Sequence, residues 1–159
     1  MIQHNINGSL VFNRSWAEYK VGFNDSRGNY WLGNDLLSQL TLTGRYKLRI
    51  DLQSRSNSTW YYAEYSTFIV QPESDNYTLN VSGYSGNAGG DALSIQNGMK
   101  FTTYDRDNDV WSGNCGIGGG FWYSNCCGGC VNYNYAYFKW WYLPGGWWLQ
   151  STRMWLQCK

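Results

Sequence analysis

The sequence has few charges, no concentration of basic residues and no long apolar run. Charged residues make up 14% of the chain, and the formal net charge is +1. Proteins that neutralise nucleic-acid phosphates need a basic stripe, so we predict no nucleic-acid partner. The longest apolar run is far shorter than the roughly 20 residues that a helix needs to cross a bilayer, so we predict no membrane insertion.

Histidine is nearly absent, which bears on catalysis. The single histidine, His4, lies close to one end of the sequence. A Ser-His-Asp or Cys-His arrangement would have to be built on that residue. Paired carboxylates could cleave glycosidic bonds, but the acidic cluster described below is better used by a cation. We therefore predict that the protein is not an enzyme.

Two features that are present indicate an oxidising compartment. The 5 cysteines gather toward the C-terminal end of the sequence, as expected of disulfides in a secreted protein. Asn-x-Ser/Thr sequons, the acceptors of N-linked glycans, begin at Asn7, Asn13, Asn24, Asn57, Asn76 and Asn80. We predict a secreted, extracellular protein. Because the first residues form no apolar signal segment, we also expect the chain to be N-terminally truncated.

Turn and cap residues predict short helices in the N-terminal part. Residues 15–20 begin with serine, place aromatic residues three apart and stop at Gly22, which predicts a helix. Residues 34–40 predict a second helix, with Asn34 as N-cap and leucines at 36, 37 and 40 on one face. Residues 8–12 follow an Asn-Gly turn and predict a strand.

Further along, the hydrophobic period changes to two. Residues 46–52 alternate apolar and charged side chains, and we expect strands there and over 60–70 and 77–84, with a turn at 72–75. Helices followed by antiparallel strands predict an α+β fold. We expect one domain over 1–159, with a sheet and helix scaffold over 8–100 and a loop-rich binding subdomain over 101–159.

Residues 101–130 hold most of the chemistry. Asp105, Asp107 and Asp109 alternate along the chain, so their carboxylates can converge on one hard cation while backbone carbonyls complete its coordination. An EF-hand is excluded, because Val110 stands where glycine is required and Gly116 where the bidentate glutamate belongs. The alternative is an acidic surface turn.

Several segments together carry a family resemblance. They include GSLVFNRSWAEYKVGF (8–23), YWLGNDLLSQLT (30–41), FTTYDRDND (101–109), GGFWYSNC (119–126) and TRMWL (152–156). In this order they resemble a fibrinogen C-terminal-like (fibrinogen-related) domain of the ficolin and tachylectin type. The resemblance implies a twisted antiparallel sheet with short helices and a loop-rich calcium- and ligand-binding part. The family's N-terminal portion, with its first cysteine pair, is missing.

The resemblance assigns roles within the aspartate loop. It implies that Ca2+ is held by the side chains of Asp107 and Asp109 and by the backbone carbonyls of Trp111 and Gly113. Asp105 would act from outside the first coordination sphere. Calcium is the one cofactor that we expect.

The resemblance also implies a short disulfide between Cys115 and Cys126. Cys127, Cys130 and Cys158 have no counterpart in the family, and we expect one bridge among them, between Cys130 and Cys158. A zinc site from these three lacks a clear fourth ligand. A redox role for the CxxC pair lacks a βαβ context.

Lectins of this family hold an acetyl group in a pocket beside the calcium loop. The resemblance implies a cis peptide at Asn125–Cys126 that shapes this pocket, and Tyr123 as a wall residue. Cys127 stands where these lectins usually have histidine. Because the segment from 132 to 140 is short, the remaining aromatics are candidates by proximity alone, with a role as core or edge-strand residues as the alternative: Tyr135, Tyr137 and Trp140.

Two functions follow from the resemblance. The first is a non-catalytic, calcium-dependent lectin that binds acetylated sugars or surface glycans in innate defence. The second is a protein-, peptide- or receptor-binding module in adhesion or signalling. In either case oligomerisation through the missing N-terminal region would raise avidity.

Overall fold

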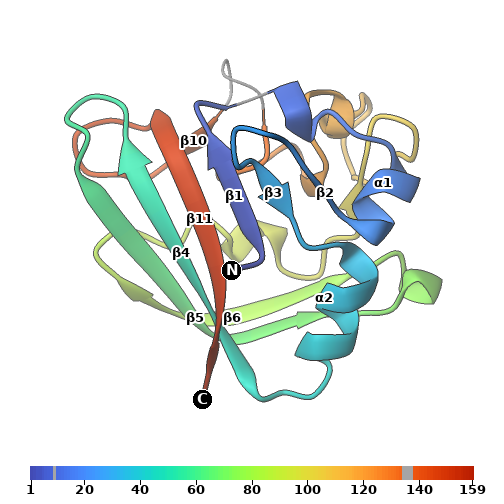
Figure 1. Ribbon diagram of the computed structural model, residues 1–159. Helices are drawn as coiled ribbons and strands as arrows, with labels where there is room; N and C mark the ends of the chain where they lie inside the picture. Colours follow the sequence, from blue (N-terminus) through green and yellow to red (C-terminus); the bar gives the residue numbers. More distant parts are fainter. Residues whose placement is uncertain (9, 134–137) are drawn as a thin grey trace.

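The central feature is a seven-stranded antiparallel sheet in a computed structural model that describes residues 1–8, 10–133 and 138–159 (Figure 1). The C-terminal strand β11 lies in the middle of the sheet, between the N-terminal strand β1 and strand β4. The order across the sheet is β2 (Phe23–Asn24), β3 (Tyr30–Trp31), β1 (Gln3–Ile6), β11 (Leu149–Cys158), β4 (Tyr46–Ser54), β5 (Trp60–Val70) and β6 (Leu79–Gly86).

Short helices and two small ladders complete the fold. The helices are α1 (Trp16–Val21) and α2 (Asn34–Thr41), with single 3-10 turns η1 (Leu10–Phe12), η2 (Glu73–Asp75), η3 (Ser94–Gln96) and η4 (Cys115–Gly118). Strand β7 (Phe101–Thr102) pairs with β8 (Phe121–Trp122), and β9 (Gly129–Cys130) pairs with β10 (Lys139–Trp140). No described helix is long and apolar enough to cross a membrane.

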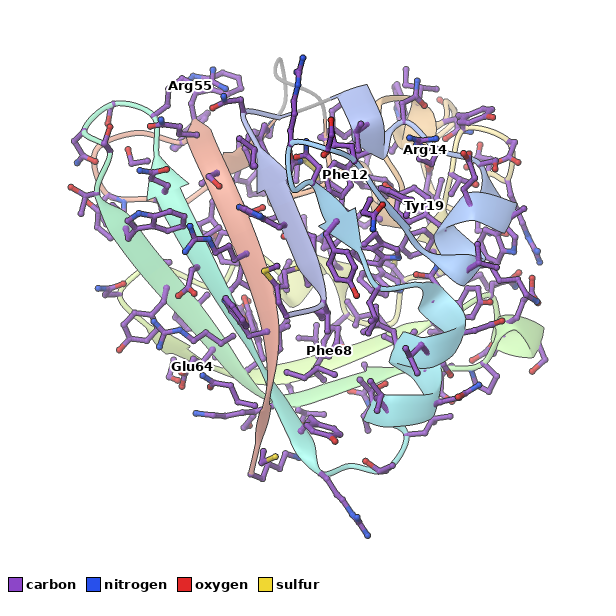
Figure 2. The ribbon with its side chains drawn as sticks, viewed as in Figure 1. Phe12, Arg14, Tyr19, Arg55, Glu64 and Phe68 are labelled. Carbon is purple, nitrogen blue, oxygen red and sulfur yellow. A yellow bond between two sulfur atoms is a disulfide. The ribbon has the colours of Figure 1, made fainter. Side chains whose placement is uncertain are left out.

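Strand β4 confirms the alternation that residues 46–52 show in the sequence. Leu48, Ile50 and Leu52 are buried on the inner face of the sheet. On the outer face Glu64 pairs with Lys47 at 3.0 Å and with an Arg49 guanidinium nitrogen at 3.3 Å (Figure 2). One apolar face and one polar face are what a period of two requires of a sheet that covers a core on one side.

Helix α1 confirms the start and stop signals of residues 15–22. The Ser15 hydroxyl accepts a hydrogen bond from the backbone N–H of Glu18, and the Glu18 carboxylate accepts one from the backbone N–H of Ser15, which is a capping box. Gly22 ends the helix with φ 93°, where a β-carbon would lie 2.6 Å from the Leu32 carbonyl oxygen. From this helix Tyr19 reaches the core and donates to the Phe12 carbonyl at 2.7 Å (Figure 2).

Three details of the helix and strand predictions are wrong. Residues 8–12 form no strand: after a left-handed turn at Asn7 and Gly8 the chain enters η1. The N-cap of α2 is Gly33 and not Asn34, because the Asn34 side-chain oxygen accepts the buried indole N–H of Trp31 at 2.9 Å. Of the three leucines, Leu36 is exposed, so they do not share one buried face.

Aromatic side chains from both halves of the chain form the core. The Trp122 ring lies 5.1 Å from Phe101, 6.1 Å from Phe68 and 6.2 Å from Trp31, measured between ring centroids. All four side chains are almost completely buried. The segment that carries the candidate site is therefore packed directly against the main sheet.

We expect the stability of the fold to depend on pH through Glu73. This carboxylate is paired with Lys20 and accepts a hydrogen bond from the Trp16 indole N–H at 2.8 Å, and these contacts hold its pKa below the usual value. A depressed folded pKa contributes stability that is fully present above the unfolded pKa of about 4.3 and is lost as pH falls through the folded pKa. Urea unfolding between pH 2.5 and 6 measures this loss, and Glu73→Gln should flatten it. Parallel curves for the two proteins would contradict the prediction.

Candidate functional site

The aspartate loop runs from β7 to η4. Thr103 and Arg106 exchange backbone hydrogen bonds of 3.0 and 3.2 Å, which close a tight turn. The Asn114 side chain then ties the far end of the loop back to the turn by donating to the carbonyls of Thr103 and Tyr104, both at 3.1 Å. In the loop between these two anchors Asp107 is exposed and Asp109 is half-buried.

Asp105 faces the scaffold. Its carboxylate accepts hydrogen bonds from the backbone N–H of Trp16 at 2.9 Å and from the Thr103 hydroxyl at 2.8 Å. It therefore fixes the loop to the first turn of α1. This position agrees with a role outside the coordination sphere of a cation.

Asp107 and Asp109 organise the loop backbone. An Asp107 oxygen accepts from the Asp109 N–H at 3.3 Å, while the two oxygens of Asp109 accept from Trp111 N–H at 2.9 Å and Cys115 N–H at 2.8 Å. Burial raises the pKa of Asp109, the two N–H donors oppose that shift, and the charge of Asp107 adds to it. Ionised together, the two carboxylates repel each other.

The two outer carboxylates of the loop could be ligands for a hard cation. Among the described residues neither Asp107 nor Asp109 forms an ion pair with lysine or arginine, so their charges lack a cationic partner. No group of three acidic, histidine or cysteine side chains converges in the described chain. A calcium ion here would need main-chain carbonyls as well, and the predicted ones belong to Trp111 and Gly113. Calcium binding by these four residues stays a prediction.

Two disulfides flank the end of the loop. Cys115 and Cys126 are bonded, with their Cα atoms 5.3 Å apart, as the resemblance implied. The second bridge joins Cys127 to Cys130, so the predicted bridge between Cys130 and Cys158 is wrong. The turn between Cys127 and Cys130 brings their Cα atoms to 5.6 Å, within disulfide reach. Cys158 is a free, exposed thiol at the end of β11.

A cavity of about 270 Å³ lies beside the aspartate loop and the two disulfides. Most of its wall is apolar, and among the described residues that line it one side chain, Lys139, is charged. The lining residues are Trp111, Asn114, Ile117, Cys126, Cys127, Cys130, Tyr133 and Lys139. The loop, the disulfides and β10 therefore enclose one small pocket.

Only part of the predicted pocket lines this cavity. Of the predicted residues, Cys126 and Cys127 belong to its wall. Tyr123 does not: it is completely buried behind the wall, its hydroxyl donates to the Gly119 carbonyl at 2.6 Å, and its ring lies 6.1 Å from that of Tyr133. The expected wall role of Tyr123 is therefore wrong, since the backbone directly after β8 directs this side chain into the core.

Trp140 is likewise a core residue and not a ligand contact. It is completely buried, and its indole N–H donates to the Gly90 carbonyl at 3.3 Å. Asn125 is exposed at a turn and does not line the cavity. The two remaining candidates, Tyr135 and Tyr137, lie outside the described residues.

The peptide between Asn125 and Cys126 is trans, because no cis bond occurs in the described chain. The expected cis peptide is therefore corrected. The turn is made instead by a left-handed backbone at Cys126, with φ 61°. This conformation lets the Ser124 N–H donate to the Cys126 carbonyl at 3.1 Å, which closes the hairpin.

Sequence reasoning gave no role to four of the lining residues: Asn114, Ile117, Tyr133 and Lys139. For Ile117 the sequence does contain a signal of an outward-facing side chain, because this residue is flanked by glycines on both sides. A β-carbon on Gly116 would lie 2.6 Å from the Thr103 carbonyl carbon, and one on Gly118 would lie 2.2 Å from the Tyr133 ring. These glycines allow close packing while Ile117, 61% exposed, turns outward.

The order of the sheet, with its C-terminal strand at the centre, and the loop-rich half that holds the site define a fibrinogen-like globe. The sequence matches the family described as fibrinogen beta and gamma chains, C-terminal globular domain, over residues 1–157, and the chain belongs to this family. The structure resembles the fibrinogen-like globe domain of human ANGPTL2, with a TM-score of 0.87 and 37% identity, over 99% of this chain and 78% of that one.

Other relatives have different names and contexts. Mouse microfibril-associated glycoprotein 4 is 43% identical over 133 residues, which are 79% of this chain and 51% of the relative. Human ficolin-3 is 39% identical over 138 residues, 86% of this chain and 46% of the relative. The lamprey fibrin D-dimer, solved with the peptide ligand Gly-His-Arg-Pro-amide, has a TM-score of 0.84 and 32% identity over 98% of this chain and 59% of that chain. This chain thus spans about half the length of microfibril-associated glycoprotein 4 and of ficolin-3.

Proposed function

We propose that this chain is a non-catalytic, calcium-supported recognition domain of an extracellular protein, and that it binds the acetyl group of a sugar. The observation that carries the proposal is the apolar pocket of about 270 Å³, which shares Trp111 with the aspartate loop and Cys126 with the adjoining disulfide. Small-ligand sites are mostly apolar with few polar groups that fix orientation. The family membership and the similarity to ficolin-3 support the same function.

Under this proposal, individual lining residues have different roles in binding an acetylated sugar. Ile117 and Tyr133 offer apolar surface to the acetyl methyl group, with the Cys127–Cys130 disulfide beside them. The Asn114 side chain is already engaged, because its oxygen accepts from Gly116 N–H at 2.6 Å and its amide donates into the loop. Lys139 brings the charged group of the pocket wall and is placed to contact sugar oxygens.

Calcium would act on this pocket through the loop. Asp107 and Asp109, with the carbonyls of Trp111 and Gly113, would hold the ion, which would supply positive charge between two repelling carboxylates. These residues fix the backbone that carries the Trp111 ring at the pocket edge. Loss of the ion should therefore loosen one wall of the pocket and weaken ligand binding.

A pocket variant tests the proposal. Ile117→Asp should weaken binding to immobilised N-acetylglucosamine by at least about tenfold, because a charge replaces apolar contact worth at least about 1.4 kcal/mol. Retention on the column and a glycan array, each run with calcium and with chelator, measure the effect. Leu36→Asp, at an exposed leucine on α2, is the matched control and should bind normally. Equal binding by the two variants would contradict the proposal.

A protein or peptide ligand is the second candidate. The lamprey fibrin relative was solved with a peptide, and Cys127 here replaces the histidine expected in acetyl-binding lectins. Under this alternative the wild-type chain is not retained by acetylated sugars, and Ile117→Asp changes nothing on the glycan array. Binding of a peptide library that is lost in Ile117→Asp would then assign the same pocket to peptides.

A further inference from the structure

The six sequons differ sharply in their structural setting. Asn76 is partly buried, whereas the other five asparagines are exposed: Asn7, Asn13, Asn24, Asn57 and Asn80. A glycan on an asparagine must leave the folded surface without displacing it. Exposure therefore separates the sequons that the fold can accommodate from those that it resists.

Two of the exposed sequons lie on the two edges of the main sheet. Strand β2 is one edge and carries Asn24, and strand β6 is the other and carries Asn80. An edge strand presents unpaired backbone groups, which can pair with another chain unless something covers them. The two sequons therefore lie on the two strands whose unpaired backbone groups could pair with another chain.

The β2 edge leaves room for a glycan at Asn24. Asn24 faces Tyr30 across the β2–β3 ladder and is exposed. The following turn is held by the Asp25 carboxylate, which accepts from the N–H groups of Arg27 and Asn29 at 3.0 and 2.9 Å. This turn needs neither the Asn24 side chain nor Ser26, which is also exposed.

The β6 edge is covered along one half only. Leu79 N–H donates to the Met99 carbonyl at 2.9 Å, and Val81 N–H donates to the Asn97 side chain at 2.8 Å. Beyond Ser82 no further strand covers the outer side of β6 among the described residues. Asn80 is exposed and stands next to the point where this cover ends.

We propose that Asn24 and Asn80 carry N-linked glycans and that these glycans keep the two sheet edges from pairing with a second copy of the chain. Asn76 is the contrast. Its backbone is left-handed, with φ 50°, its side-chain oxygen accepts from Arg106 at 2.6 Å, and the buried Tyr77 follows it. A glycan on the Asn76 amide nitrogen would have to leave a partly buried, left-handed turn whose side chain is held by Arg106, so we expect this sequon to stay unmodified.

The inference rests on the extracellular location given under the proposed function, and it does not depend on the ligand. The test is to secrete the 159-residue chain from cultured animal cells behind an added signal segment. Enzymatic deglycosylation in oxygen-18 water, followed by peptide mass spectrometry, reads out each sequon. Label at Asn24 and Asn80 and none at Asn76 is the expected result. An unlabelled Asn24 or Asn80 would overturn the assignment, whatever the glycan array shows.

The protective role needs its own variants. Ser26→Ala combined with Ser82→Ala removes both sequons and leaves both asparagines in place, while Ser26→Thr with Ser82→Thr keeps both sequons. Sedimentation velocity over a concentration series should show a shift from monomer toward larger species in the alanine pair only. An unchanged monomer in the alanine pair would show that the glycans do not protect the edges.

Discussion

Replacing Asp109 by asparagine is expected to abolish the stabilisation of this domain by calcium. At a free calcium concentration of 100 times the dissociation constant, a single site stabilises the folded state by about 2.7 kcal/mol. Asp109→Asn removes a charged ligand and places an amide NH2 against the N–H of Trp111 or Cys115, which both donate to the native carboxylate. Loss of one acceptor costs about 1–3 kcal/mol in addition. Urea unfolding with calcium and with chelator measures both effects.

Asp105→Asn separates a calcium effect from a general weakening of the loop. Asp105 accepts hydrogen bonds from Trp16 and Thr103, so this variant should be less stable than the wild type. Its gain on adding calcium should nevertheless persist. If Asp109→Asn gains as much as the wild type, or the wild type gains nothing, calcium is not bound by this loop.

The strands were predictable where a local pattern decides them. Residues 46–52 alternate in polarity, and burial of one face needs no information from elsewhere in the chain. The central place of β11 has no local signature. Met154 pairs with Gln3 on one side and with Ile50 on the other, and these registers join parts of the chain that are distant in sequence.

The candidate site also has one part that a local sequence pattern predicts and one part that it does not. The alternation of Asp107 and Asp109 is local, so the loop could be identified from the sequence. The pocket could not, because Ile117, Tyr133 and Lys139 come from three separate segments that meet around the disulfides. The resemblance also assigned Tyr123 wrongly to the pocket wall, since the identity of a residue does not show whether the backbone turns its side chain toward the pocket or toward the core.

Trp122 links the two halves of the chain, and replacing it by alanine is expected to cost about 3–5 kcal/mol of unfolding free energy. The ring is completely buried among the core aromatics, and its indole N–H donates to the Tyr77 carbonyl at 2.6 Å. The substitution leaves a cavity and an unpaired carbonyl together. Because domains are stable by only about 5–15 kcal/mol, the substitution should remove a large share of the stability of the fold.

Two further variants make this expectation measurable. Trp122→Phe keeps a ring but loses the N–H, so it should fold with a stability between those of the wild type and Trp122→Ala. Trp111→Ala removes a tryptophan that is 47% exposed, and it should change the unfolding free energy by less than about 0.5 kcal/mol while weakening ligand binding. Denaturant unfolding measures the unfolding free energy of all three variants. If Trp111→Ala is as destabilised as Trp122→Ala, the aspartate loop is part of the folding core, and the division between a rigid scaffold and a binding rim is wrong.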